Sequence, residues 1–175
     1  MTGFASLLSA TLTAFLTLLF ARAAWHKLAD FTAFTGFVAD YELVPEHLVR
    51  PVSVAVVAAE VAAVLAQLLP GGQPYGLGVA VALLAVYGAA IAVNLHRGKD
   101  RIECGCGGTA QPLSASLVAR NAVLAGLGLV ALAAGPYALG LDEAVAALGS
   151  GFALFVGFVL SEQILANFAH ARLRR

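Results

Sequence analysis

Long apolar runs dominate the pattern of this chain, and almost all of them are free of charge. An α-helix of about 20 apolar residues crosses the roughly 30 Å of hydrocarbon in a bilayer. Lipid cannot satisfy backbone N–H and C=O groups, so the runs are expected to form helices rather than strands. The pattern predicts an all-α, polytopic membrane helical bundle that forms a single domain over residues 1–175. Its transmembrane helices are predicted at residues 2–21, 51–69, 75–95, 117–134 and 144–168.

The segment between the first two runs, residues 25–51, has a different pattern. It is too short and too polar to cross a bilayer. Its apolar side chains recur at helical spacing among polar ones, at Phe31, Phe34, Phe37 and Val38. This spacing predicts an amphipathic helix that lies in the membrane interface. Trp25 and Tyr41 are expected to anchor it at the level of the lipid headgroups.

The composition agrees with a lipid environment. Hydrophobic residues make up 61% of the chain and charged residues only 11%, whereas about a quarter of the residues in a soluble domain are charged. A single soluble core of this size could not hide so much apolar surface. The ten basic residues balance the ten acidic ones, so the net basic surface of a nucleic-acid-binding protein is missing. We therefore expect the lipid bilayer as a partner and no nucleic acid.

The basic residues all fall on one side of the five predicted spans. They are Arg22, Lys27, Arg50, Arg97, Lys99, Arg101, Arg120, Arg172, Arg174 and Arg175. Cytoplasmic loops collect Lys and Arg, so we predict that the N-terminus is outside and the C-terminus inside. The loop between the third and fourth spans is then cytoplasmic. The first run is expected to stay in place as a span, because its basic residues follow it, whereas those of a cleaved signal peptide precede it.

This loop holds the only two cysteines, Cys104 and Cys106, with Gly105 between them. Two cysteines so close together can form a very small disulfide ring, and the glycines around them permit the positive φ angles that it needs. A ring this tight is expected to be strained, and strained disulfides tend to be labile and oxidising. Neighbouring basic residues and the start of the next helix favour the thiolate. The sequence therefore predicts a redox-active pair.

Two other interpretations of the cysteine loop stay open. The two cysteines could be small buried residues in a glycine-rich turn. They could also bind a metal together with His96, with His26 or His170 as a further ligand, since zinc often binds two Cys and two His. The spacing of His96, Cys104 and Cys106 matches no usual zinc pattern, so metal binding is the weaker alternative.

Five further residues are candidates for supporting roles. Glu60 lies near the middle of the second span, where a carboxylate is expensive and usually faces the bundle interior. It is interpreted either as a group that handles protons or holds a bound head group, or as a carboxyl that is hydrogen-bonded for packing. His26 and Lys27 directly follow the first span. Arg97 and Arg120 flank the cysteine loop, where Arg120 could orient the loop, attract an acidic group or act as an ordinary interfacial anchor.

One series of motifs is more specific than these single residues. Its central part is Asn94-Leu95-x-Arg97-Gly98-x-x-x-Ile102-x-Cys104-Gly105-Cys106-Gly107-Gly108, followed by Arg120-Asn121. Its upstream parts are Lys27-Leu28, Tyr41-x-Leu43-x-Pro45 and Glu60. Together they resemble the MauE family of bacterial membrane proteins. The resemblance implies a bundle like that of DoxX-like proteins and, more distantly, of the quinone-coupled disulfide formers DsbB and VKOR.

The resemblance also implies a function in thiol–disulfide chemistry in the bacterial inner membrane. Cys104 and Cys106 would be the redox pair, with Glu60 and Arg97 as supporting residues. The expected partner is a thioredoxin-like protein of the MauD type, and the expected role is maturation of an exported protein such as the small subunit of methylamine dehydrogenase. A quinone cofactor rests on analogy alone.

Two other functions and one conflict stay open. A non-catalytic scaffold with a structural or metal-binding cysteine loop is the main alternative, and a small proton-coupled transporter that uses Glu60 is a weaker one. An exported protein needs oxidising equivalents outside, whereas the charges place the cysteines on the cytoplasmic side. Either the loop relays electrons across the membrane, or it re-enters the membrane, or the topology is inverted.

Overall fold

The structure of the chain is a computed structural model that describes residues 2–99, 102–105, 111–137 and 139–173, with the side chains of the last helix described up to Ile164. The predicted fold class is confirmed, since the described part is a bundle of helices. These are α1 (Thr2–Ala29), α2 (Phe31–Asp40), α3 (Glu46–Leu68), α4 (Gln73–His96), α5 (Ala115–Ala134) and α6 (Leu141–Leu173). All but α2 are long and apolar enough to cross a membrane.

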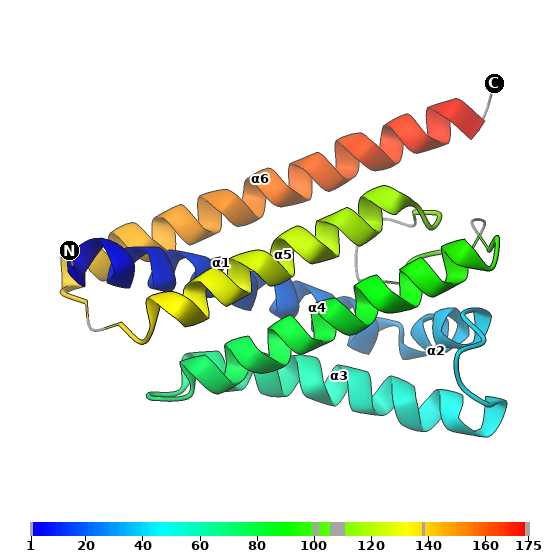
Figure 1. Ribbon diagram of the computed structural model, residues 1–175, viewed down its shortest axis with the longest axis horizontal. Helices are drawn as coiled ribbons and strands as arrows, with labels where there is room; N and C mark the ends of the chain where they lie inside the picture. Colours follow the sequence, from blue (N-terminus) through cyan, green and yellow to red (C-terminus); the bar gives the residue numbers. More distant parts are fainter. Residues whose placement is uncertain (1, 100–101, 106–110, 138, 174–175) are drawn as a thin grey trace.

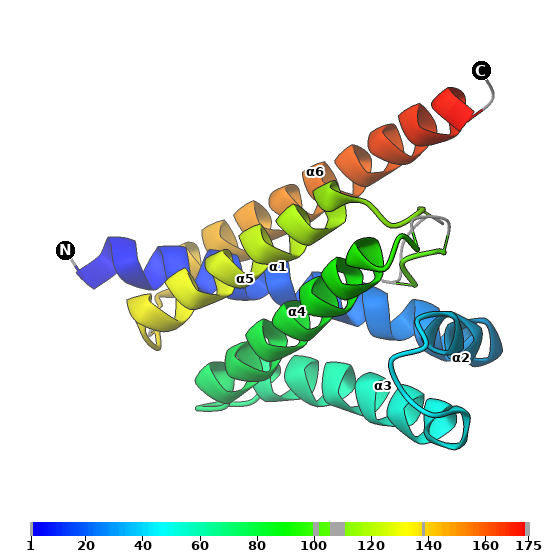
Figure 2. The same ribbon diagram turned by 45° about the vertical axis from the view of Figure 1, so that its right-hand side comes forward.

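Helix α1 is the centre of the bundle (Figures 1 and 2). It packs against each of the other helices, α3 packs against α4, and α4 against α5, while α6 lies along α1. Successive long helices run in opposite directions, so the end of α1, the start of α3, the end of α4 and the start of α5 meet at one end of the bundle. Helix α2 lies at this same end. We call it the loop end, because the chain between α4 and α5 carries the cysteines.

Apolar side chains and glycines hold the long helices together. The main cluster joins α1, α4 and α5, with Leu16, Leu77 and Leu124 among its buried members. Glycine lets two helices approach closely in a membrane bundle. A Cβ atom on Gly151 of α6 would lie 2.7 Å from the Ala14 Cβ of α1 and 2.9 Å from a backbone oxygen of the same helix. The contact between α1 and α6 therefore depends on this glycine.

The five long helices all extend beyond the predicted spans at one end or both, and the ends of α1 and α3 at the loop end have identifiable causes. Helix α1 continues eight residues beyond position 21, because Arg22 and Lys27 face acidic partners inside the bundle and do not mark its edge. Helix α3 begins at Glu46, and Pro51 lies inside it as its sixth residue. Proline is tolerated close to the start of a helix, where it costs few intrahelical hydrogen bonds.

The amphipathic segment is helical as predicted. Asp30 caps α2 by accepting a 2.9 Å hydrogen bond from the Ala33 backbone N–H. Trp25 lies in the last turns of α1 and its side chain is exposed, so its role as a headgroup anchor stays a prediction. The same holds for Tyr41, which is half-buried. Its side chain turns inward, and its hydroxyl donates a 3.1 Å hydrogen bond to the Cys104 carbonyl.

The close contact at Gly151 makes a testable prediction. Gly151→Ala should destabilise the protein by about 1–3 kcal/mol, because the added methyl group has backbone in front of it and overpacks the interface. Gly149→Ala is the matched control on the same helix, since nothing lies within 4 Å of its Cβ position, and it should cause no loss of stability. Thermal unfolding in detergent measures both variants. Equal stability of the two would contradict the proposed α1–α6 contact.

Candidate functional site at the loop end

A short two-stranded contact shapes the chain around the first cysteine. Glu103 and Pro112 form an isolated antiparallel bridge. The Cys104 N–H donates to the Gln111 carbonyl at 3.0 Å, and the Leu113 N–H donates to the Ile102 carbonyl at 3.1 Å. The two arms of the loop are thereby tied together between α4 and α5.

Glycine is required directly after this bridge. Gly105 has a φ of +63°, and a Cβ atom there would lie 2.9 Å from the Phe37 Cβ of α2. Left-handed backbone favours glycine, and the approach to α2 leaves no space for a side chain. The helix between the first two spans therefore forms the support on which the cysteine loop rests.

Cys104 is half of a disulfide, and the other cysteine of the chain, Cys106, lies outside the described residues. The Cys104 side chain packs against a small apolar cluster that includes Ile91 and Leu117. The Tyr41 hydroxyl holds its carbonyl group. Burial raises the pKa of Tyr41 to about 12, against the opposing effect of the Arg120 charge. This hydroxyl therefore remains a donor at physiological pH.

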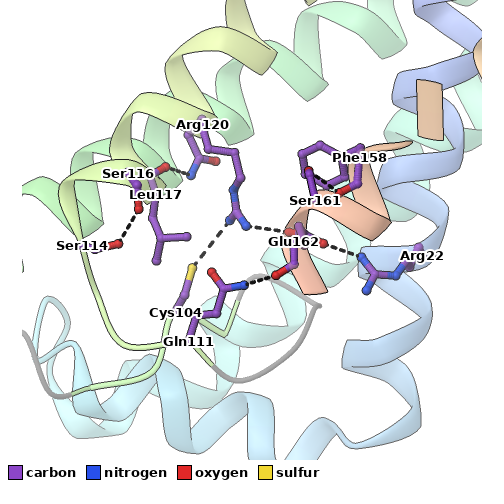
Figure 3. Close-up of polar contacts among 11 residues, drawn as sticks. Arg22, Cys104, Gln111, Ser114, Ser116, Leu117, Arg120, Phe158, Ser161 and Glu162 are labelled. Atoms are coloured by element: carbon purple, nitrogen blue, oxygen red, sulfur yellow. Dashed lines mark hydrogen bonds and ion pairs between the residues drawn. The ribbon is translucent and has the colours of Figure 1, made fainter. Parts of the chain in front are cut away.

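A carboxylate shared by two arginines lies beside the Cys104 sulfur (Figure 3). Arg120 of α5 approaches the Sγ atom of Cys104 with one nitrogen, Nη2, at 3.9 Å. Its other terminal nitrogen donates a 2.6 Å hydrogen bond to Glu162 of α6, and Arg22 of α1 donates to the second oxygen of Glu162 at 3.0 Å. The Gln111 side chain donates to the Glu162 backbone carbonyl at 3.2 Å. Three helices and the loop are thus joined, and we call Arg22, Arg120 and Glu162 the arginine cluster.

A second cluster, Lys27, Glu60 and Tyr87, lies deeper between α1, α3 and α4. The Lys27 ammonium donates a 2.7 Å hydrogen bond to the Oε1 atom of Glu60, and the Tyr87 hydroxyl donates to the same atom at 2.8 Å. The Lys27 and Glu60 side chains are 3% and 0% exposed. The rings of Phe34 and Tyr87 flank the ammonium at 5.3 and 5.6 Å from their centroids, within the range of cation–π attraction. We call these three residues the lysine cluster.

Two cavities adjoin these clusters. The larger, of about 250 Å³, lies between α1, α2, α3 and α4, and its walls are mainly apolar. Cys104, Lys27, Tyr41 and Tyr87 also line it. The smaller, of about 40 Å³, lies between the arginine cluster and the lysine cluster. Its walls include Glu60, Tyr87 and the three residues of the arginine cluster.

The other predicted site residues lie outside these clusters. His26 and His96 are exposed on α1 and α4. Arg97 is also exposed and makes a 3.4 Å contact with the Glu42 carbonyl oxygen. The Glu42 side chain pairs with Lys99 at 2.6 Å, which lowers the pKa of Glu42. These contacts fasten the end of α4 to the segment after α2.

The structure does not test the metal alternative. Within the described ranges, no three His, Cys, Asp or Glu residues lie close enough together to hold a metal ion. Cys106 and the side chain of His170 lie outside those ranges. The metal site with Cys104, Cys106 and His96 therefore stays a sequence prediction.

Several residues of the two clusters were not predicted from the sequence. Tyr87 is one aromatic residue in an apolar run, and no pattern marks it. Glu162 lies in the second half of the last predicted span, and its side chain is only 9% exposed. The available signal was its place in an apolar helix, where a carboxylate needs a cationic partner.

The fold and these clusters define the class of the molecule. It is a multi-pass membrane protein whose helical bundle buries two charged clusters beneath a cysteine-containing loop. Residues 5–134 match the family described as methylamine utilisation protein MauE. The chain belongs to the MauE family, which confirms the resemblance seen in its motifs.

Individual relatives agree with this assignment. The methylamine utilization protein MauE of Paracoccus versutus is 39% identical over 129 residues, which cover 73% of this chain and 69% of that protein. The MauE protein of Methylorubrum extorquens is 40% identical over 144 residues, 77% of each chain. That of Methylophilus methylotrophus is 33% identical over 155 residues, 85% of this chain and 80% of its own length. No solved structure matches this chain significantly.

The buried ion pair makes a prediction about stability. Lys27→Met or Glu60→Gln alone should destabilise the protein by about 3–5 kcal/mol, because each leaves one buried charge unpaired. The double variant should lose much less than the sum of the two, since both charges are then absent. Unfolding of the four proteins in detergent measures this coupling. The exposed pair Lys99 and Glu42 is the control, where Lys99→Met should have little effect. Additive losses at Lys27 and Glu60 would contradict the coupling.

Proposed function

We propose that this protein is a membrane thiol–disulfide oxidoreductase in which Cys104 and Cys106 exchange disulfides with a thioredoxin-like partner of the MauD type. The observation that supports this most is the Arg120 guanidinium 3.9 Å from the Cys104 sulfur. A cation beside a cysteine stabilises the thiolate, which is the reactive form. Glu162 fixes this guanidinium in place through a 2.6 Å ion pair.

The charges around the sulfur favour the same chemistry. The arginine and lysine clusters contain three cations and two carboxylates, which leaves one positive charge in excess within them. A thiolate at Cys104 would neutralise this charge in surroundings where water screens it poorly. Reduced Cys104 is therefore expected to be the more stable thiolate of the pair.

This asymmetry suggests the order of the exchange. A partner thiolate attacks the Cys106 sulfur, the bond between the two cysteines breaks, and Cys104 leaves as a thiolate beside Arg120. One disulfide is lost and one is formed, so the step needs no other oxidant. The thiolate with the lower pKa is the better leaving group. A second thiolate of the partner then attacks the mixed disulfide, which leaves the partner oxidised and both cysteines of this chain reduced. In the reverse reaction, Cys104 attacks the mixed disulfide at the Cys106 sulfur and releases the reduced partner.

A quinone is proposed as the electron acceptor, because a dithiol stores only two electrons and has to pass them on. The larger cavity suits the head group of such a lipid-soluble molecule, since its walls are mainly apolar and include the first cysteine. Tyr41, Tyr87 and Lys27 would hold the polar atoms of the ring. When bound, the quinone would accept the two electrons of the cysteine pair.

The physiological role is proposed from the family. Its description names methylamine utilisation, and we propose that this chain acts there, supporting the maturation of an exported, disulfide-containing protein such as the small subunit of methylamine dehydrogenase. The position of the cysteine loop at one end of the bundle is compatible with docking of a thioredoxin-like protein.

The proposed orientation has the N-terminus outside and the C-terminus inside the bacterial inner membrane. It is supported by the basic residues described at the loop end, such as Arg50, Arg97 and Lys99, since cytoplasmic ends of membrane helices collect Lys and Arg. The cysteine loop would then face the cytoplasm and relay electrons across the membrane.

The side of the loop can be measured directly. After reduction in intact cells, a membrane-impermeant thiol reagent should label Cys104 and Cys106 only once the cells are permeabilised. The reagent reports the side because it cannot cross the lipid. A variant with both cysteines replaced by serine is the control for background labelling. Full labelling in intact cells would show that the topology is inverted.

Trapping tests the exchange itself. The Cys104→Ser variant should accumulate a mixed disulfide between Cys106 and the partner, because the residue that resolves it is gone. Cys106→Ser should give less adduct, since Cys104 is only partly exposed and lies beside Arg120. Adducts are detected by non-reducing gels, reversal with a thiol and mass spectrometry.

The controls separate redox chemistry from a scaffold role. Arg120→Gln should raise the pKa of the Cys104 thiol and slow reoxidation of the reduced cysteine pair by the oxidised partner about threefold per pKa unit, because the smaller thiolate fraction is partly offset by the greater nucleophilicity of the thiolate. Arg97→Gln, an exposed arginine at the same end, should leave the rate unchanged. If neither single cysteine variant forms an adduct and the double variant keeps full function, the chain is a scaffold.

A further inference from the structure

Two buried polar atoms on the walls of the smaller cavity lack a hydrogen-bond partner among the residues that the structure describes. They belong to Glu60, through Oε2, and to Arg120, through Nε. A buried polar atom without a partner is costly, and ordered water commonly satisfies it. A volume of about 10–15 Å³ is enough for one water molecule, and this cavity has about 40 Å³. Its walls are largely apolar, but the polar groups of Glu60, Tyr87 and Arg120 converge on it, and a water molecule with such partners fits its size.

The lysine cluster separates this cavity from the larger one beside Cys104. Glu60 lines the smaller cavity, Lys27 lines the larger, and Tyr87 lines both. The Glu60 carboxylate is 2.7 Å from the Lys27 ammonium and 2.8 Å from the Tyr87 hydroxyl. Hydrogen bonds of this length let a proton pass between two groups without any rearrangement of the chain. The three side chains therefore connect the smaller cavity to the larger one.

One wall of the smaller cavity is formed by partly exposed side chains. The side chains of Arg22 and Arg120 on its wall are 22% and 20% exposed. Glu162 lies between them and is 9% exposed. The arginine cluster is thus the more exposed part of the cavity wall, whereas the Glu60 side chain is fully buried.

We propose that the smaller cavity holds water and that the lysine cluster transfers a proton from this water to the acceptor site beside Cys104. This inference rests on the proposed function. It gives Glu60, Lys27 and Tyr87 a role in proton transfer that is separate from the exchange with the partner protein.

Disulfide formation coupled to reduction of the acceptor balances only if the protein supplies a proton. Closing the disulfide from the Cys104 thiolate and the Cys106 thiol releases two electrons and one proton. A quinone-class acceptor takes up two electrons and two protons. The second proton has to come from the protein, and Lys27 and Tyr87 are the groups on the cavity wall that can donate it. Glu60 then restores the donor from the water cavity.

Filling the smaller cavity tests the proposal without changing a charge. Ala23 lines this cavity, and Ala23→Val should displace the water with two methyl groups. Ala21→Val is the matched control, since Ala21 is exposed on the same helix. Tyr87→Phe and Glu60→Gln remove the hydroxyl and the carboxylate. Tyr87→Phe keeps the ion pair, so the test does not depend on whether the Glu60 variant folds.

The reduced protein in lipid nanodiscs is mixed with a short-chain quinone, and quinone absorbance gives the rate. Loss of a proton donor typically costs about 10²-fold or more. We expect Ala23→Val, Tyr87→Phe and Glu60→Gln to be slowed at least about tenfold, and Ala21→Val to match the unmodified chain. Exchange with the thioredoxin-like partner should be unchanged in Ala23→Val, Ala21→Val and Tyr87→Phe, which keep every charge of the two clusters. Infrared difference spectra of the oxidised and reduced protein, without quinone, should contain a carboxyl band that is absent in Glu60→Gln and shifted in Ala23→Val.

The outcomes distinguish the two proposals. If the unmodified chain reduces the quinone and all variants match it, with no Glu60 band in the spectra, the proton route is overturned and the proposed function stands. If the unmodified chain exchanges with the partner but does not reduce the quinone, the quinone acceptor fails and the proton route with it. Slowed quinone reduction in the variants, together with normal exchange with the partner, supports both the proposed function and the proton route.

Discussion

The need to pair buried charges arranges the loop end of this protein. A carboxylate inside a membrane bundle is stable only if a cation or several donors face it. Glu60 meets this need with Lys27 and Tyr87, and Glu162 meets it with two arginines. Each acid thus ties together helices that are far apart in the sequence. Helix α6, which packs only along α1 among the described helices, is fixed at this end by its acid.

The same pairing places the cysteine loop. Arg120 bonds to Glu162 with one nitrogen and approaches the Cys104 sulfur with another. From the opposite side, Tyr41 and Gly105 hold the loop against α2. The first cysteine is therefore set between a fixed cation and an apolar cavity, which are the surroundings that a thiolate and a lipid-soluble acceptor respectively require. Without these contacts, the first cysteine would have neither the cation nor the apolar cavity beside it.

The sequence predicts the bundle well, because lipid imposes one strong rule on every span. The apolar runs predict all five long helices. Their ends are predicted less well, for example at α1, which continues because Arg22 and Lys27 turn inward. Glu60 could be identified as an interior residue for the same reason. The partners of Glu60 could not be identified in this way. The position of Lys27 is typical of an interfacial cation, and Tyr87 resembles any lipid-facing or core aromatic residue. Which face of a helix meets which neighbour is decided by packing that one chain's pattern does not encode.

The two cavities would separate the path of the electrons from the path of the protons. In the proposed function, the electrons of the cysteine pair would leave to an acceptor in the larger, apolar cavity beside Cys104, and protons would arrive through water in the smaller cavity. Glu60 lines the smaller cavity and Lys27 the larger, so the lysine cluster connects the two. The Glu60 Oε2 atom has no hydrogen-bond partner among the described residues, so water in the smaller cavity would complete its hydrogen bonding. The same water would supply the proton that the acceptor needs.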